Sequence, residues 1–295
     1  KCTSYLINKV FYNETGDNNF HNLFQEKMYP HLQSSANNKP TQDSITAFED
    51  FIRRYAINKT FATKLRGLRG YEIAFICDDS GSMKNPMVPR HSSGRNQEAT
   101  TRWEELKKIV SIVVDLASTL DPDGVDVYFL NRKPALNVRS SKELTNIFAI
   151  PPNGLTPIVR VLREVLQAKK KEIQEKKLLV LLATDGIPTA EDGTANPQEL
   201  YQVLLHERIP IERVPATIIC CTDDQECMSY LNDWDRKIQK LDVVDNYEKE
   251  KQQIREYQGN SFPFSFGDYV VKILLGGVDS WFDLLDEEKV SLDND

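Results

Sequence analysis

Short apolar segments alternate with longer amphipathic segments over most of this chain. The apolar segments cover residues 71–77, 125–130, 178–183 and 215–221, with a weaker one at 241–244 and a short candidate strand at 137–139. Uninterrupted apolar runs of this length are typical of strands that are buried on both faces. Their alternation with helical segments predicts an α/β fold, in which a Rossmann-like, doubly wound, mostly parallel sheet is flanked by helices.

Capping residues mark where the helices between these strands begin. Thr101 and Glu104 form a capping-box pattern, and the segment behind them repeats apolar residues at helical spacing up to residue 120. Thr156 is expected to be the N-cap of a long helix, with Pro157 as its first residue. Asn196, which also precedes a proline, is expected to start a further helix.

Charge and apolar spacing predict where one of these helices ends and where the last helices of the chain lie. The long helix that begins near residue 157 is expected to end in the lysine-rich run 169–177, whose charges are most simply a solvated face. The segments 269–275 and 281–285 have the composition of terminal helices. We therefore expect an extended C-terminal helical region after the last strand.

The length of 295 residues allows either one large domain with an appendage or two domains. Residues 1–69 are polar, rich in asparagine and without a strong strand, although 41–57 is amphipathic and 22–32 has a weaker helical pattern. We expect 1–69 to be a helical or irregular extension that packs on a main domain of residues 70–295. A separate regulatory piece is the alternative.

Composition and charge limit the possible partners. The chain is 40% hydrophobic and 27% charged, as in ordinary globular proteins, and its net charge of −7 argues against a nucleic-acid surface. No apolar run approaches the roughly 20 residues that span a bilayer, so direct membrane insertion is not expected. Cys77, Cys220 and Cys221 lie in apolar segments, which favours reduced thiols and a cytoplasmic location. Glycosylation sequons at Asn13 and Asn58 favour the alternative, an extracellular or cell-surface location.

The most specific polar motif follows the first apolar strand directly. Asp78, Ser80 and Ser82 alternate in a turn made tight by Gly81, so that one acid and two hydroxyls can face one point. Hard oxygen ligands of this kind suit Mg²⁺, Mn²⁺ or Ca²⁺ and suit zinc poorly. Serine and aspartate are also ordinary turn residues, so the motif alone is weak.

Two other segments are expected at the same edge of the sheet. Thr156 precedes a helix, and Asp185 lies just past the apolar strand 178–183. Taken singly, Thr156 is most simply a cap and Asp185 a turn residue. Because ligands of doubly wound sheets bind at the carboxyl ends of the strands, the joint occurrence of these residues with Asp78 predicts one site.

The complete pattern resembles a known family. Asp78-x-Ser80-x-Ser82, followed by Thr156 and then by Thr184-Asp185-Gly186, is similar to the metal-ion-dependent adhesion site of von Willebrand factor A domains. The resemblance covers roughly residues 70–245. It implies one Mg²⁺ or Mn²⁺, with Ca²⁺ possible, held by hydroxyls of the two serines and Thr156 and by the two aspartates directly or through water.

The resemblance also implies a function. Family members use the bound cation to grip an Asp or Glu presented by a partner protein, so a metal-dependent adhesion or scaffold module is expected, with the oligomeric state left open. The neighbouring residues would form the rim of the ligand site: Asp79, Gly81, Met83, Gly154 and Gly186. The loop 84–100, which borders this site, would either read the partner or be a simple insertion.

Two other functions compete with binding through a metal. One is a metal-independent intracellular scaffold within a multiprotein complex. The other is a metal-assisted hydrolase with Asp78 as nucleophile. Catalysis is disfavoured because Ser80 stands where a second acid would be expected, no phosphate-binding loop occurs, and the four histidines are scattered. We therefore do not expect an enzyme.

Overall fold

The computed structural model describes residues 42–87, 100–120, 123–222, 224, 228–231 and 233–290. Within them, six strands form one sheet in the order β3-β2-β1-β4-β5-β6. The strands are β1 (Tyr71–Cys77), β2 (Val125–Phe129), β3 (Ala135–Val138), β4 (Lys177–Thr184), β5 (Ala216–Cys220) and β6 (Leu241–Val244). All neighbouring pairs are parallel except β2 and β3. The predicted Rossmann-like, mostly parallel α/β sheet is confirmed.

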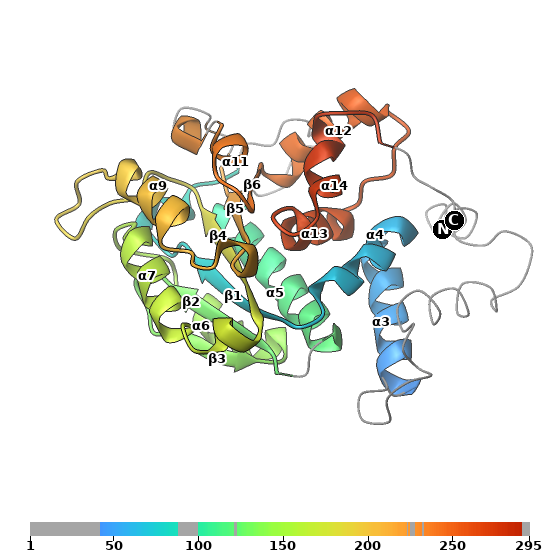
Figure 1. Ribbon diagram of the computed structural model, residues 1–295, viewed down its shortest axis with the longest axis horizontal. Coiled ribbons are helices and arrows are strands. Elements are labelled where there is room, and N and C mark those ends of the chain that lie inside the picture. Colours follow the sequence, from blue (N-terminus) through green and yellow to red (C-terminus); the bar gives the residue numbers. More distant parts are fainter. Residues whose placement is uncertain are drawn as a thin grey trace, which may run out of the picture.

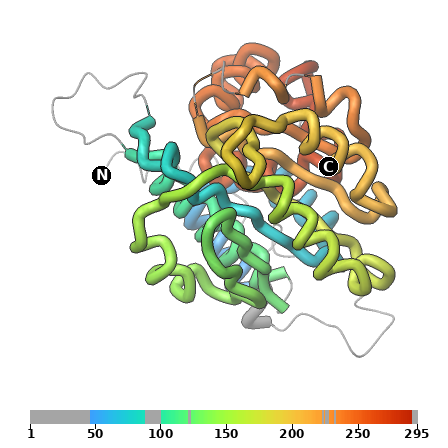
Figure 2. Tube along the Cα trace, turned by 90° about the vertical axis from the view of Figure 1, so that its left-hand side faces the viewer, coloured from blue at the N-terminus to red at the C-terminus, as the bar shows by residue number. Residues whose placement is uncertain are grey.

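Helices cover both faces of the sheet (Figure 1). One face carries α3 (Gln42–Tyr55), α4 (Lys59–Lys64), α5 (Arg102–Leu120), α6 (Thr145–Phe148), α12 (Tyr247–Gln258), α13 (Phe266–Leu275) and α14 (Ser280–Asp283). The other carries α7 (Ile158–Ala168), α8 (Glu172–Glu175), α9 (Pro197–His206) and α11 (Trp234–Lys237). In the tube of Figure 2, the green part of the chain lies toward the bottom of the molecule and the orange-to-red part toward the top.

Alternation along β1 explains why the sheet is covered twice. Ile73 and Phe75 belong to the core under α5 and α13, whereas Ala74 and Ile76 belong to the core under α7 and α9. Successive side chains of a strand point to opposite faces, so an all-apolar strand requires a helical layer on each side. None of the described helices is both long enough and apolar enough to cross a bilayer.

The predicted N-terminal helix is observed as α3, and it joins the main core. Phe48, Phe51 and Ile52 are buried in the same cluster as residues of α5 and α13. Asn58 N also donates a 2.6 Å hydrogen bond to Asp268 Oδ1 at the start of α13. The boundary at residue 69 stays a prediction. The helix expected over 22–32, the sequon at Asn13 and most of the loop 84–100 lie outside the described residues.

Two sequence-based expectations about helices were wrong. The predicted long helix is α7, which ends at Ala168, before the lysine-rich run. The separate one-turn helix α8 follows it. Lys169, assigned to a solvated face, is instead nearly buried, and its Nζ lies 2.7 Å from both Asp126 Oδ2 on β2 and Glu172 Oε2. The aspartate on the strand draws this lysine inward, a long-range pairing that a local charge pattern does not reveal.

Candidate metal centre

Strand register brings the predicted residues to one edge of the sheet. Cys77, the last residue of β1, is paired with Phe129 of β2 and Ala183 of β4. Asp78 N extends this pairing by donating a 2.9 Å hydrogen bond to Ala183 O. The loops that follow β1 and β4 therefore begin side by side, and Asp185 follows two residues after Ala183.

Asp78 is fully buried at this edge. Its Oδ1 accepts a 2.8 Å hydrogen bond from Ser80 N, and its Oδ2 accepts a 2.7 Å bond from the Thr184 hydroxyl. Burial, reinforced by the negative charge of Asp185, raises the pKa of Asp78 to about 6. None of the described lysines or arginines forms an ion pair with Asp78. Its carboxylate is thus a buried negative charge without a counter-ion in the part of the chain that the structure describes.

A chain of hydrogen bonds connects the serines to Asp185. Ser80 Oγ and Ser82 Oγ are 3.0 Å apart, and Ser82 Oγ donates a 2.8 Å bond to Asp185 Oδ1. Asp185 Oδ2 accepts a 2.8 Å bond from Arg102 Nη1. The structure therefore brings Ser80, Ser82 and Asp185 into one connected group, to which Asp78 is joined through the Ser80 backbone.

Thr156 lies on a loop that is tied to the same turn. Gly81 N donates to Gly154 O at 3.1 Å. The prediction that Thr156 is the N-cap of the following helix was wrong, because α7 begins at Ile158 with Pro157 in the cap position and no side-chain cap. The Thr156 hydroxyl makes no hydrogen bond to any described residue, so helix capping does not occupy it.

The predicted rim residues fall into two groups. Gly81, Gly154 and Gly186 lie on the loops around the site. Position 154 requires glycine, because its φ is +124° and a Cβ there would lie only 2.4 Å from Asn131 Oδ1. The side chains of Asp79 and Met83, in contrast, are fully buried. They are inside the protein rather than on a rim.

Asp79 instead connects the loops from within. Its Oδ1 accepts hydrogen bonds from Asn131 N at 2.8 Å and Asn131 Nδ2 at 3.1 Å, and its Oδ2 lies 2.8 Å from Arg132 Nε. Arg132 also donates to three carbonyls that precede Thr156: Ile147 in α6, and Ile150 and Pro151 in the loop that follows α6. This buried network holds the Thr156 loop against the turn after β1.

Sequence reasoning missed three residues that shape the site. Arg102 pairs with Asp185, and Asn131 and Arg132 hold Asp79. Thr184 belongs to the motif found in the sequence, but its hydrogen bond to Asp78 was not predicted. The three missed residues depend on contacts between segments that are distant in the sequence, for which the sequence contains no local signal.

The donor set fits a divalent cation of the hard class. Two carboxylates and three hydroxyls offer oxygen alone, which Mg²⁺ and Mn²⁺ prefer. No three His, Cys, Asp or Glu side chains of the described residues group in a way that could hold a metal. The predicted set contains only two such side chains, so the hydroxyls would have to complete it. Asp78, Asp185 and Arg102 carry a formal charge of −1 together, which leaves room for added positive charge.

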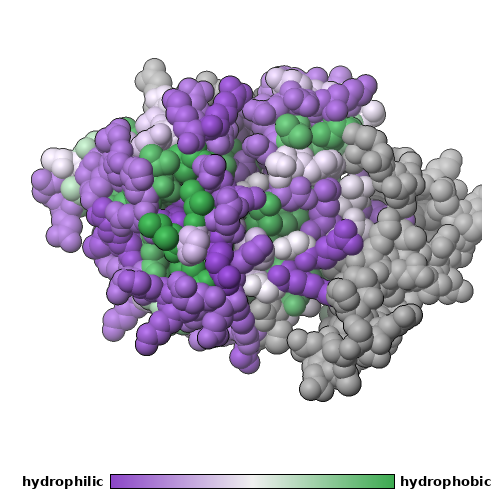
Figure 3. Space-filling view, in the orientation of Figure 1, coloured by the Kyte–Doolittle hydropathy of each residue, from purple (hydrophilic) through white to green (hydrophobic). Residues whose placement is uncertain are grey.

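The surface around the site combines exposed apolar side chains with a neighbouring groove. Ile150, Leu155 and Ile187, on or beside the loops that carry the site residues, have exposed side chains. The face of the molecule seen in Figure 3 is mostly hydrophilic with smaller apolar patches. A groove of about 740 Å³ runs along α7 from Pro157 and Thr189.

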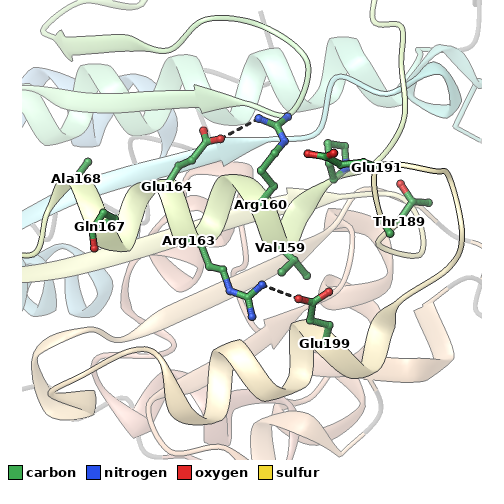
Figure 4. A pocket seen from close by; sticks show the side chains of 11 residues that line it. Val159, Arg160, Arg163, Glu164, Gln167, Ala168, Thr189, Glu191 and Glu199 are labelled. Carbon is green, nitrogen blue, oxygen red and sulfur yellow. Dashed lines mark hydrogen bonds and ion pairs between the residues drawn. The ribbon is translucent and has the colours of Figure 1, made fainter.

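Two ion pairs are formed by residues that line this groove (Figure 4). Arg160 pairs with Glu164 within α7 at 2.9 Å, and Arg163 reaches Glu199 of α9 at 2.6 Å. None of the five predicted metal ligands lines the groove.

Comparison of the chain with protein-family models and with curated proteins gave no match.

Proposed function

We propose that this chain is a von Willebrand factor A domain whose adhesion site holds a divalent cation and binds a partner protein. The observation that carries the proposal is the convergence of Asp78, Ser80, Ser82 and Asp185 at the carboxyl edge of the sheet, within one hydrogen-bonded group. The fully buried Asp78, with no ion-pair partner among the described residues, supports it further. A buried carboxylate of this kind is stabilised by a neighbouring cation.

Each protein group has a definite part in this proposal. Asp78 and Asp185 supply the negative charge, and the hydroxyls of Ser80, Ser82 and Thr156 supply neutral oxygen ligands. Mg²⁺ or Mn²⁺ is the expected cation, with Ca²⁺ as an alternative. Because Asp78, Asp185 and Arg102 together carry a formal charge of −1, such a cation would be only partly neutralised by the site. It would then attract an Asp or Glu side chain of the partner to complete its octahedral shell.

A metal-independent scaffold is the second candidate, and one observation favours it. Both carboxylate oxygens of Asp185 are already bound by protein groups, Ser82 Oγ and Arg102 Nη1. The two functions differ in a simple respect, because a chelator abolishes partner binding only if the cation is needed. A metal-assisted hydrolase is less well supported, since the carboxylate of Asp78 is buried and held by two hydrogen bonds.

Two observations support a cytoplasmic location as part of the proposal. Cys77, Cys220 and Cys221 are buried free thiols, as expected of a reducing compartment. The sequon residue Asn58 is the N-cap of α4, where its side-chain oxygen accepts a 2.8 Å bond from Thr60 N. Asn58 is also half-buried, which leaves less room for a glycan on its amide nitrogen.

Removing one oxygen ligand is expected to weaken Mg²⁺ binding at least about tenfold, roughly 1.4 kcal/mol. The test is calorimetric titration of Mg²⁺ into chelator-treated wild-type protein, Ser80→Ala and Asp185→Ala. Ser111→Ala is the matched control, because the Ser111 hydroxyl only donates to Lys107 O on the surface of α5. Equal affinities in all four proteins, or no heat from the wild type, would contradict the proposed function.

A further inference from the structure

Arg102 is placed at the candidate metal centre in an unusual way. It is the first residue of α5, and its side chain is only 12% exposed. Nη1 donates a 2.8 Å hydrogen bond to Asp185 Oδ2, whereas the buried Nε has no hydrogen-bond partner among the described residues. A positive side chain that gives Asp185 only one hydrogen bond, through Nη1, therefore lies against one of the proposed ligands.

The backbone around Arg102 holds this side chain in position. Arg102 N donates a 3.1 Å bond to Asn85 O, and Pro86 and Thr101 form an antiparallel bridge. Thr101 N also donates a 2.9 Å bond to Glu104 Oε2, which closes the capping box predicted from the sequence. Since α5 is a long helix with a capped start, the guanidinium is attached to a rigid element rather than to a mobile loop.

Neutralising Asp185 does not by itself account for this geometry. A guanidinium that only pairs with a carboxylate commonly uses two parallel N–H groups. Here a single bond, through Nη1, joins Arg102 to Asp185. Asp78 and Asp185 together contribute −2 and Arg102 contributes +1, so a divalent cation would leave the group with a net charge of +1.

We propose that Arg102 is a second anchor for the acidic side chain of the partner: the cation takes one carboxylate oxygen and the guanidinium takes the other. This inference rests on the proposed function and adds to it. It names the feature that would select a carboxylate over a neutral oxygen ligand. A neutral amide or hydroxyl could occupy the free position of the cation, but it carries no charge to complement the guanidinium.

The proposal has a consequence that a purely structural role does not share. The positive charge of Arg102 repels the cation and attracts the carboxylate. Removing that charge should therefore strengthen metal binding and weaken carboxylate binding. A variant that merely loosens the site would weaken both.

The test uses two variants of the whole chain and two probes. Arg102→Gln removes the charge, and Arg102→Lys keeps the charge but loses the planar fork. Mg²⁺ alone is titrated by calorimetry, and acetate is then titrated into Mg²⁺-saturated protein and followed by amide chemical shifts. Arg102→Gln is expected to bind Mg²⁺ at least about threefold more tightly and acetate at least about threefold more weakly than wild type. Arg102→Lys should match wild type with Mg²⁺ and weaken acetate binding.

Two results would overturn the proposal, and they differ from a failure of the proposed function. The first is a wild-type protein that binds Mg²⁺ while Arg102→Gln leaves acetate affinity unchanged. The second is a loss of both affinities in Arg102→Gln, which would indicate a structural role only. A wild-type protein that binds no Mg²⁺ would instead overturn the proposed function, and this inference with it.

Discussion

Replacing Lys272 by methionine is expected to lower the free energy of unfolding by about 3–5 kcal/mol at pH 8. Lys272 lies on α13 and is only 1% exposed. Its Nζ lies 2.9 Å from Glu250 Oε1 of α12 and 2.6 Å from Asp286 Oδ1, and it donates a 2.9 Å bond to Phe282 O. Asp242 of β6, also buried, contributes to the same electrostatic environment.

The expected loss is large because the lysine compensates several acids at once. Without its charge, Glu250 and Asp242 would be buried carboxylates with no cation, and removing one partner of a buried ion pair costs far more than the pair contributes. The loss should shrink toward pH 5, where the carboxylates take up protons and no longer need the ammonium group. The cluster therefore holds β6, α12 and α13 together only while the lysine is present.

Urea denaturation followed by tryptophan fluorescence measures this effect. Lys237→Met is the matched control, because Lys237 and its partner Asp233 are each 58% exposed and an exposed ion pair contributes under about 1 kcal/mol. The interpretation fails if Lys272→Met loses less than the control, or if its loss is the same at pH 5 as at pH 8.

The unfolding free energy is expected to fall by about 2 kcal/mol between pH 6.5 and pH 8, and Asp242→Asn should remove most of that fall. Burial raises the pKa of Asp242 to about 8, although the positive charge of Lys272 acts in the opposite direction. Asp242 Oδ2 has no hydrogen-bond partner among the described residues. The acids that face it raise its pKa further, and they come from α12, α14 and the turn after α14: Glu250, Asp283 and Asp286.

The direction of this pH dependence follows from proton counting. In the unfolded chain Asp242 loses its proton near the ordinary aspartate pKa of 3.8, whereas in the folded protein it keeps the proton up to about 8. The folded state therefore binds more protons between these values, and stability falls as pH rises. Burial also raises the pKa of Glu250, which adds a contribution of the same sign.

The pH window separates this cluster from other buried acids. Asp78 and Asp268 have pKa values raised to about 6, so they are largely ionised in both states above pH 6.5. Urea denaturation at several pH values, run in parallel on wild type and Asp242→Asn, isolates the contribution of the one carboxyl. Parallel curves for the two proteins, or a stability that rises with pH in the wild type, would show that Asp242 is not protonated in the fold.

The sequence predicted the sheet because its signal is local. Each strand is a short apolar run, and each face of β1 has to be covered by helices. The alternation of apolar strands and amphipathic helices along the chain therefore predicts a sheet between two helical layers. Asp78 and Asp185 could be named for the same reason, since each directly follows a strand end. The direction of β3 and the end of α7 were not predictable in this way, because they depend on side chains such as Asp126 that bind across the fold.

Two properties could be read without a structure: the period of the apolar residues and the position of the polar residues relative to the strand ends. Those properties belong to neighbouring residues along the chain. Three further features are visible only in the packed fold: Arg102 contacts Asp185, Lys272 lies among acids of three other elements, and the side chain of Asp79 is buried. These contacts join segments far apart in the chain. Their energies come from burial and charge at short distance, which exist only after the helices have packed on the sheet.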